Sequence, residues 1–161
     1  MEPEERTILA AQGYFELEMP REALRELDTL PPAAQMRVDA LELRVAILMK
    51  EKRWREGARA SERLCAVSPD SPAGFIHHAF CLHELGKTGE ARSVLLEGPP
   101  ALVNEATYHY NLACYECALG NLDAARAHLE VSLKLKPDLR GHAREDPDLE
   151  PLRRSAGEGG L

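Results

Sequence analysis

The amino-acid sequence repeats with a period of 34 residues, and this period constrains the fold more than any other feature. Small side chains dominate two series in that register: the first is Ala11, Val45, Ala79 and Ala113, and the second is Ala23, Gly57, Ala91 and Ala125. A fixed period of roughly 20–50 residues is typical of chains that stack one structural unit many times. Because the register needs no gap, we expect four equivalent units in a solenoid.

Each unit is predicted to be a pair of antiparallel helices, each about 14 residues long. A small side chain is favoured where two such helices approach closely, since a larger one would push their axes apart. Turn residues fall between the predicted helices, at Gly86 and at Gly120–Asn121. Pro69 and Pro137 lie two periods apart and end two of the units, because proline lacks the backbone donor that a continuing helix needs.

The overall composition agrees with packed helices and argues against several classes of protein. Of the 161 residues, 44% are hydrophobic but only 5% are aromatic, which favours an all-α chain. The net charge is −7, and we find no basic cluster in the sequence. We therefore expect no nucleic-acid partner and no binding to an anionic membrane surface. No apolar run approaches ~18 residues, so we expect no membrane insertion. The start, MEPEERTILAAQ, lacks a basic segment followed by an apolar one, which predicts a cytoplasmic protein with reduced thiols.

These repeats resemble the tetratricopeptide repeat (TPR), a 34-residue unit that pairs two helices. With Glu4 as the first position, the four repeats span 4–37, 38–71, 72–105 and 106–139. The last repeat carries the family's residues most completely, at Leu112–Ala113, Gly120, Ala125, Leu129 and Pro137. The resemblance implies an all-α fold, a right-handed superhelical α-solenoid of four helix-turn-helix repeats.

Two repeats depart from the family pattern, and the end of the chain lies outside the repeats. Pro31-Pro32 and Pro99-Pro100 fall where the second helix of repeats one and three would continue. We expect these helices to end about one turn early, with an extended stretch before the next repeat. Residues 140–161 are predicted to be a capping segment, in which Leu149 and Leu152 cover the last repeat, followed by a disordered tail, SAGEGGL.

The resemblance also implies a concave groove, lined by the first helix of each repeat, that binds a segment of a partner protein. The family's groove positions give these partner-binding candidates: Glu5, Ile8, Gln12, Phe15, Asp39, Glu42, Met49, Ile76, Phe80, His83, Tyr110, Cys114 and Cys117. Acidic residues dominate the N-terminal half of this set and apolar residues the C-terminal half. The expected ligand is therefore a protein or peptide segment with basic and apolar side chains.

The motif Cys114-x-x-Cys117 can be interpreted in three ways. Its helical spacing places both thiols on one face, where free cysteines serve as small apolar residues. A zinc site would need further ligands, for which His77, His83 and His109 are candidates, and a regulatory disulfide would join the two sulfurs. The mid-helix position and the ~10 Å between neighbouring first helices favour the structural interpretation. We expect no metal site and no cofactor.

The predicted function is a non-enzymatic protein-protein interaction module, an adaptor or scaffold. An enzyme is not expected, because the sequence offers no catalytic triad, phosphate-binding glycine loop or paired acids with supporting geometry. Two alternatives remain open: a secretion-type TPR chaperone that holds an apolar segment of its partner, and a thiol- or zinc-responsive sensor acting through Cys114 and Cys117. The first helix, with Ile8, Leu9 and Phe15, either caps the solenoid or pairs with a second copy in a homo-oligomer.

Overall fold

A computed structural model describes residues 1–157 of the chain, and every regular element in that range is a helix. The long helices form four antiparallel pairs. The first helices are α1 (Pro3–Glu16), α4 (Val38–Lys50), α6 (Pro72–Glu84) and α8 (Ala106–Ala118). The second helices are α2 (Pro20–Asp28), α5 (Trp54–Val67), α7 (Thr88–Leu96) and α9 (Leu122–Leu135).

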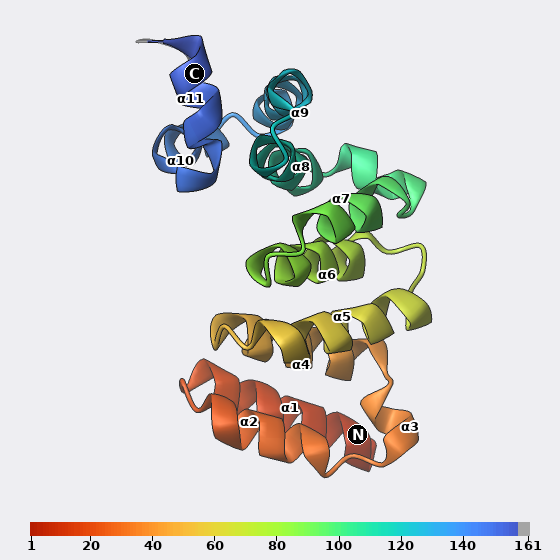
Figure 1. The fold of residues 1–161 in the computed structure, drawn as a ribbon. Coiled ribbons are helices and arrows are strands. Elements are labelled where there is room, and N and C mark those ends of the chain that lie inside the picture. The colour runs from red at the N-terminus through yellow and green to blue at the C-terminus, as the bar shows by residue number, and fades with distance from the viewer. Residues whose placement is uncertain (158–161) are drawn as a thin grey trace.

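The pairs stack into an open, elongated solenoid that rises from the N-terminus to the C-terminus (Figure 1). The first helices contact one another in the order α1, α4, α6 and α8. Each second helix packs against its own first helix, and α2, α5 and α7 also pack against the first helix of the following pair. The prediction of an all-α solenoid is therefore confirmed, and the first helices form one continuous side of it.

The two series of small residues lie where the helices meet. Six of their members have no exposed surface: Ala11, Ala23, Ala79, Ala91, Ala113 and Ala125 are each 0% accessible to solvent. Val45, the largest member, is also buried, at 1%. A larger side chain at these places would force the helix axes apart, so the 34-residue period follows from packing.

The turn inside each helix pair uses a left-handed backbone at one register position. The φ angle is 58° at Glu18, 56° at Lys52, 79° at Gly86 and 83° at Gly120. These four residues are spaced by one period each. Glycine adopts this conformation without steric cost, whereas a side chain with a Cβ atom does not. The first two turns therefore carry backbone strain that the last two avoid.

The two Pro-Pro pairs shorten the helices that precede them. Helices α2 and α7 have nine residues each, whereas α5 and α9 have fourteen, so the predicted early end is confirmed. The predicted extended stretch is wrong, because short helical turns follow: α3 (Pro32–Gln35) and the 3-10 helix η1 (Pro100–Asn104). Proline suits the first position of a helix, where its fixed φ helps and no donor is needed. Each connection also buries a leucine, Leu30 before α3 and Leu102 within η1.

The C-terminal segment folds back onto the last helix pair. It consists of α10 (Leu139–Glu145), the 3-10 helix η2 (Pro147–Leu149) and α11 (Glu150–Ala156). Leu149 and Leu152 are 0% exposed, and the segment contacts both α8 and α9. The predicted tail begins at Ser155, which still belongs to α11, while residues 158–161 lie outside the described part of the chain. No helix within residues 1–157 is long and apolar enough to span a bilayer.

Candidate functional site: the first-helix face

The predicted partner-binding residues, which we call the first-helix face, differ in accessibility along the solenoid. Exposed members are Glu5, Gln12, Asp39 and Glu42; half-buried members are Ile8, Phe15, Met49, Ile76, Phe80 and His83; buried members are Tyr110, Cys114 and Cys117. The accessible members therefore come from α1, α4 and α6. All three members on α8 are covered.

Much of the acidic charge on this face is already used within the chain. The carboxylate of Glu5 accepts the backbone N–H of Glu2 at 3.1 Å and caps α1. Both oxygens of Asp39 accept from the Arg37 guanidinium, at 3.0 and 2.8 Å, which lowers the pKa of Asp39. Glu42 forms no ion pair within 4.0 Å with any residue in the range 1–157. It is the acid on this face best placed to meet a ligand.

A hollow of about 300 Å³ lies between the starts of α6 and α8. Ala73, Ile76 and Thr107 line it, and His77 stands at its side. Burial lowers the pKa of His77, and the nearby Glu42 carboxylate partly opposes this shift. The hollow therefore has a mostly apolar lining at neutral pH, to which Glu105 contributes one carboxylate, and the carboxylate of Glu42 lies nearby.

Two aromatic members of the face connect neighbouring repeats. The ammonium of Lys50, on α4, lies 5.2 Å from the centre of the Phe15 ring on α1. The Phe80 ring meets Trp54 edge to face, with 5.7 Å between ring centres. Such contacts hold the rings in place, while both rings stay half exposed. The face thus offers pre-positioned aromatic surface to a ligand.

The C-terminal end of the first-helix face is filled by the C-terminal segment. The Tyr110 hydroxyl donates to Asp146 Oδ2 at 2.6 Å, and the Tyr110 ring lies 5.6 Å from that of His142. His83 approaches Asp148 Oδ2 through Nε2 at 3.2 Å. Asp146 Oδ1 also accepts the backbone N–H of Asp148 at 3.0 Å. Sequence reasoning placed the segment at this end but did not identify Asp146, His142 and Asp148 as its contacts.

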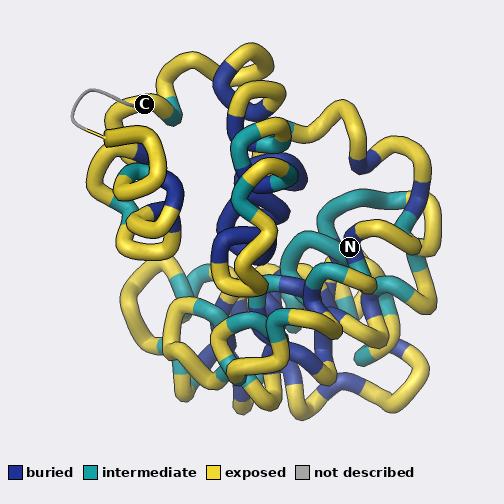
Figure 2. Tube along the Cα trace, turned by 45° about the horizontal axis from the view of Figure 1, so that its top comes forward, coloured by how far each residue is buried: buried dark blue, intermediate teal, exposed yellow. Residues whose placement is uncertain are grey.

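Equivalent positions in other repeats show that this closure is specific to α8. The counterparts of Tyr110 and Cys117 on α4, Glu42 and Met49, are exposed and half-buried, although α6 follows them. On α8 both positions are less than 9% exposed. The C-terminal segment therefore covers more of the face than a following repeat does. In Figure 2 the longest dark runs lie in the upper part of the view, beside this segment.

The two cysteines of the Cys114-x-x-Cys117 motif are packed under the same segment. Cys114 is 5% and Cys117 is 4% exposed. Burial raises the pKa of both thiols, and the carboxylates of Asp146 and Asp148 add to the shift. Thiolate chemistry and zinc binding both need the deprotonated sulfur. Burial and the raised pKa values therefore favour the structural interpretation of the motif.

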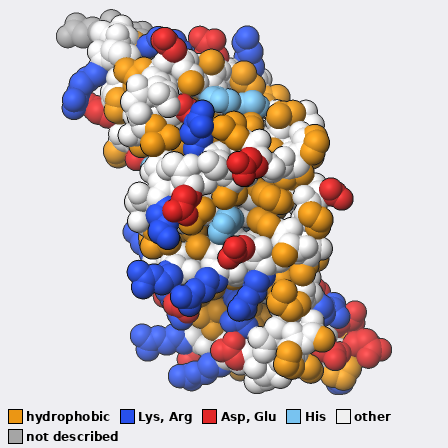
Figure 3. Space-filling model, turned by 45° about the vertical axis from the view of Figure 1, so that its right-hand side comes forward, with side chains coloured by type: hydrophobic (Ala, Val, Ile, Leu, Met, Phe, Trp, Pro, Cys, Tyr) orange, Lys and Arg blue, Asp and Glu red, His pale blue; other side chains and the backbone are white. Residues whose placement is uncertain are grey.

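The prediction that the chain has no basic cluster is wrong. Six arginines line one hollow between α2 and α5: Arg21, Arg25, Arg44, Arg53, Arg59 and Arg63. Figure 3 shows a group of Lys and Arg side chains over the N-terminal half of the molecule. The cluster escaped notice because its members are scattered over more than forty positions of an acidic chain and meet only through the repeat.

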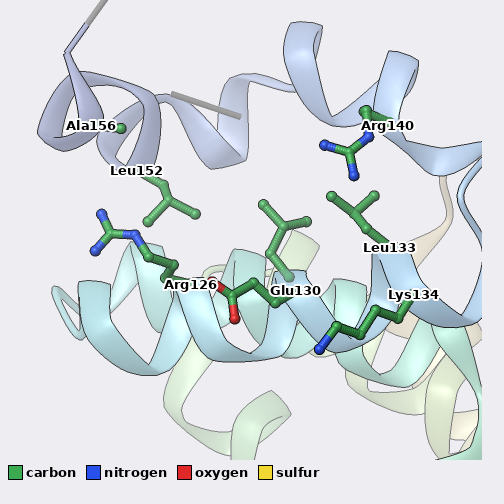
Figure 4. Close-up of a pocket in the computed structure, with 8 residues that line it drawn as sticks. Arg126, Glu130, Leu133, Lys134, Arg140, Leu152 and Ala156 are labelled. Carbon is green, nitrogen blue, oxygen red and sulfur yellow. The ribbon is translucent and has the colours of Figure 1, made fainter. Parts of the chain in front are cut away.

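A third hollow, of about 360 Å³, opens at the C-terminal end between α9, α10 and α11. Figure 4 shows Leu133 and Leu152 turned toward it, with Arg126, Lys134 and Arg140 around its edge. Arg126 Nη2 donates to Ser155 Oγ at 3.1 Å and so ties α9 to α11. Two short helices of seven residues each, α10 and α11, border the hollow opposite α9.

The fold of the chain matches solved structures of TPR proteins. YrrB, described as a TPR protein with an unusual peptide-binding site, aligns with a TM-score of 0.69 and 15% identity over 91% of this chain and 72% of its own. TTC0263, a thermophilic TPR protein of Thermus thermophilus, aligns at 0.65 and 19% identity, over 83% and 75%. MamA of Desulfovibrio magneticus RS-1, from residue 41 onward, aligns at 0.75 and 16%, over 86% and 78%.

No family model and no curated protein matches the sequence, so the relationship is carried by the fold. Four stacked helix pairs, small residues at the predicted helix contacts and the alignments above agree with one another. The chain has the tetratricopeptide-repeat fold that its sequence resembles.

Proposed function

We propose that this protein is a non-enzymatic interaction module that binds a segment of a partner protein on the accessible part of its first-helix face, over α1, α4 and α6. The ligand is an extended or helical segment with apolar side chains, which pack on Ile8, Met49 and Ile76. A basic group of the ligand meets Glu42, the acid that has no partner within the described chain.

One observation carries this proposal: the same face already holds a peptide segment, the protein's own C-terminal one. That segment buries leucines against the end helices and hydrogen-bonds to Tyr110 and His83. On α4 and α6 the apolar members of the face, Met49, Ile76 and Phe80, are only half-buried. Half-exposed apolar side chains gathered on one face are typical of a binding surface, and anchors of this kind supply most of the affinity in peptide recognition.

The proposal is tested by capture from a lysate of the source cells with three forms of the protein. They are the wild type, the face variant Met49→Glu/Ile76→Glu, and the control variant Leu96→Glu/Val131→Glu. The control places the same charges at exposed apolar residues of α7 and α9. Circular dichroism and thermal unfolding first confirm that all three are folded alike.

The expected result is a protein retained by the wild type and by the control, and reduced at least about tenfold on the face variant, as loss of two buried anchors implies. Quantitative mass spectrometry measures the amount of captured protein on each form. Equal retention by all three forms would place the binding site elsewhere on the molecule. Retention of no protein by the wild type would also contradict the proposal.

A further inference from the structure

The hollow lined by the six arginines, which we call the arginine groove, has a volume of about 390 Å³ and lies between α2 and α5. Its arginines come from three helices and one turn: Arg21 and Arg25 from α2, Arg44 from α4, Arg53 from the turn, and Arg59 and Arg63 from α5. Among residues 1–157, two carboxylates line the same hollow, those of Asp28 and Glu56. The groove is therefore strongly positive within a molecule whose net charge is −7.

Two of the six guanidinium groups are neutralised by the carboxylates of the groove itself. Arg44 Nη2 contacts Asp28 Oδ1 at 2.8 Å. Arg53 donates through Nε and Nη2 to the two oxygens of Glu56, at 2.8 and 2.6 Å. The other four, Arg21, Arg25, Arg59 and Arg63, are exposed, and no carboxylate of residues 1–157 approaches them within 4.0 Å. These four are available to an incoming anion.

The repeat register explains how these arginines come together. Arg25 and Arg59 are one period apart, as are Arg21 and Arg55, so each pair stands at one position of adjacent second helices. In repeats three and four the position of Arg25 is held by Ser93 and Ala127. At this register position an arginine is therefore present in the first two repeats and not in the last two. Like charges placed this close repel one another, and a bound anion would remove that repulsion.

The floor of the groove decides which kind of anion fits. It is formed by Leu24, Leu48 and Ala60, and no aromatic side chain lines it. Single-stranded nucleic acid binds by stacking its bases on aromatic rings, which this groove does not offer. Arginine forks bind carboxylates in pairs of parallel hydrogen bonds. An aliphatic floor between such forks suits leucine-like side chains with acidic neighbours.

We propose that the arginine groove binds an acidic protein segment, in which Asp or Glu side chains pair with Arg21, Arg25, Arg59 and Arg63 and an aliphatic side chain lies on Leu24 and Leu48. This site is formed by other elements than the first-helix face and has a ligand of the opposite charge. The protein would then hold two partner segments at once, or two parts of one partner. Neither the arginine groove nor the acidic ligand proposed for it depends on partner binding at the first-helix face.

The probe is a fluorescein-labelled peptide of roughly a dozen residues, rich in Asp and Glu, with leucine at every fourth position so that one helical face is aliphatic. Its anisotropy is titrated with the wild-type protein, with Arg59→Glu/Arg63→Glu, and with the control Lys134→Glu/Arg140→Glu. The control changes the net charge by the same amount at the opposite end of the solenoid. Competition is measured with a single-stranded oligodeoxynucleotide of equal charge and with phosphatidylserine vesicles.

The expected result is saturable binding to the wild type and the control, weakened at least about tenfold in Arg59→Glu/Arg63→Glu and reduced by added salt, as paired surface charges require. Three results would overturn the proposal. They are absence of binding to the wild type, equal loss in both double variants, and displacement of the peptide by the oligonucleotide or vesicles at equal charge concentration. The last result would assign the groove to a phosphate-bearing ligand instead.

Discussion

The hydroxyl of Tyr110 donates a 2.6 Å hydrogen bond to the carboxylate of Asp146, thirty-six residues further along the chain. Tyr110 occupies a position of the first-helix face, and Asp146 begins the turn η2 of the C-terminal segment. This bond fastens the segment over α8 and divides the face into an open part and a closed part. The proposed binding of a partner segment over α1, α4 and α6 depends on that division.

Replacing Tyr110 with phenylalanine removes the hydroxyl that fastens the segment while keeping the ring. A hydrogen bond to a charged group contributes about 1.5–3 kcal/mol, so we expect the free energy of unfolding to fall by about that amount. Urea denaturation measures it. Tyr108→Phe is the matched control: its ring is buried to the same degree, no hydrogen bond of the described chain involves its hydroxyl, and its stability should stay within about 0.5 kcal/mol of wild type. Equal losses in both variants would contradict the assigned role of the Tyr110–Asp146 bond.

Shortening Leu152 to alanine should weaken the packing of the C-terminal segment and expose the thiols of Cys114 and Cys117 beneath it. The side chain is 0% exposed, so a loss of about 2–5 kcal/mol is expected from the transfer and cavity terms. Cys117, whose sulfur lies against the Leu152 backbone, should react faster with a maleimide reagent. Mass spectrometry of the labelled peptides measures the rate at each cysteine.

The half-buried Cys65 serves as the internal reference in that labelling experiment. It lies on α5, and burial raises its pKa to about 11, so its rate should be slow and identical in wild type and variant. Faster labelling of Cys65 together with Cys117 would mean that the whole fold has loosened, and the segment would not be a separate cover.

Changing Lys52 to glycine should stabilise the protein by about 1 kcal/mol, because its φ of 56° strains a residue with a Cβ atom. The reverse change, Gly120→Lys, should destabilise it by a similar amount, since φ there is 83°. Both variants are compared by thermal unfolding. The midpoint is expected to rise in Lys52→Gly and to fall in Gly120→Lys; the reverse pair of shifts would show that the charge at the turn outweighs backbone strain.

The pair of His109 and His128 predicts a dependence of stability on pH. The two Nδ1 atoms lie 3.3 Å apart, and His109 Nε2 donates to the carbonyl of Val103 at 2.8 Å, so His128 is the donor between them. Burial, aided by His109, lowers the pKa of His128 from its ordinary 6.5, while Glu116 opposes and Arg92 reinforces the shift. The unfolded chain therefore takes up the proton first, and stability falls as the pH drops through 6.5 toward the lower folded value.

His128→Gln removes this titration, so its free energy of unfolding should change less than that of the wild type between about pH 7 and pH 5. Urea denaturation at a series of pH values gives both curves. Parallel curves would show that other groups carry the acid sensitivity.

The repeat architecture was predictable from the sequence because its cause is local and periodic. The small residues Ala11, Ala79 and Ala113 mark helix contacts separated by whole periods of 34 residues, and each is fully buried. The Pro-Pro pairs correctly predicted early helix ends, but not that Pro32 and Pro100 would each start a new helical turn. Proline favours both the end of one helix and the first position of the next. Each new turn also lies beside or contains a buried leucine, Leu30 or Leu102.

Which residues of the candidate site are exposed, covered or ion-paired was less predictable from the sequence, because this depends on contacts between distant parts of the chain. Nothing in the sequence around Tyr110 indicates that Asp146 covers it. The grouping of Arg25 with Arg59 is visible once the register is known, yet the charge of a groove depends on which carboxylates reach it. The engagement of Asp39 by Arg37 likewise changes an acidic surface that the sequence presents as free.

Hydrogen-deuterium exchange of the protein, with and without the partner that it captures, tests the central claim most directly. The account predicts slower exchange in peptides that cover α1, α4 and α6, with α7 and α9 unchanged. Slower exchange confined to α7 and α9, or no change on α4 and α6, would contradict binding on the open part of the first-helix face.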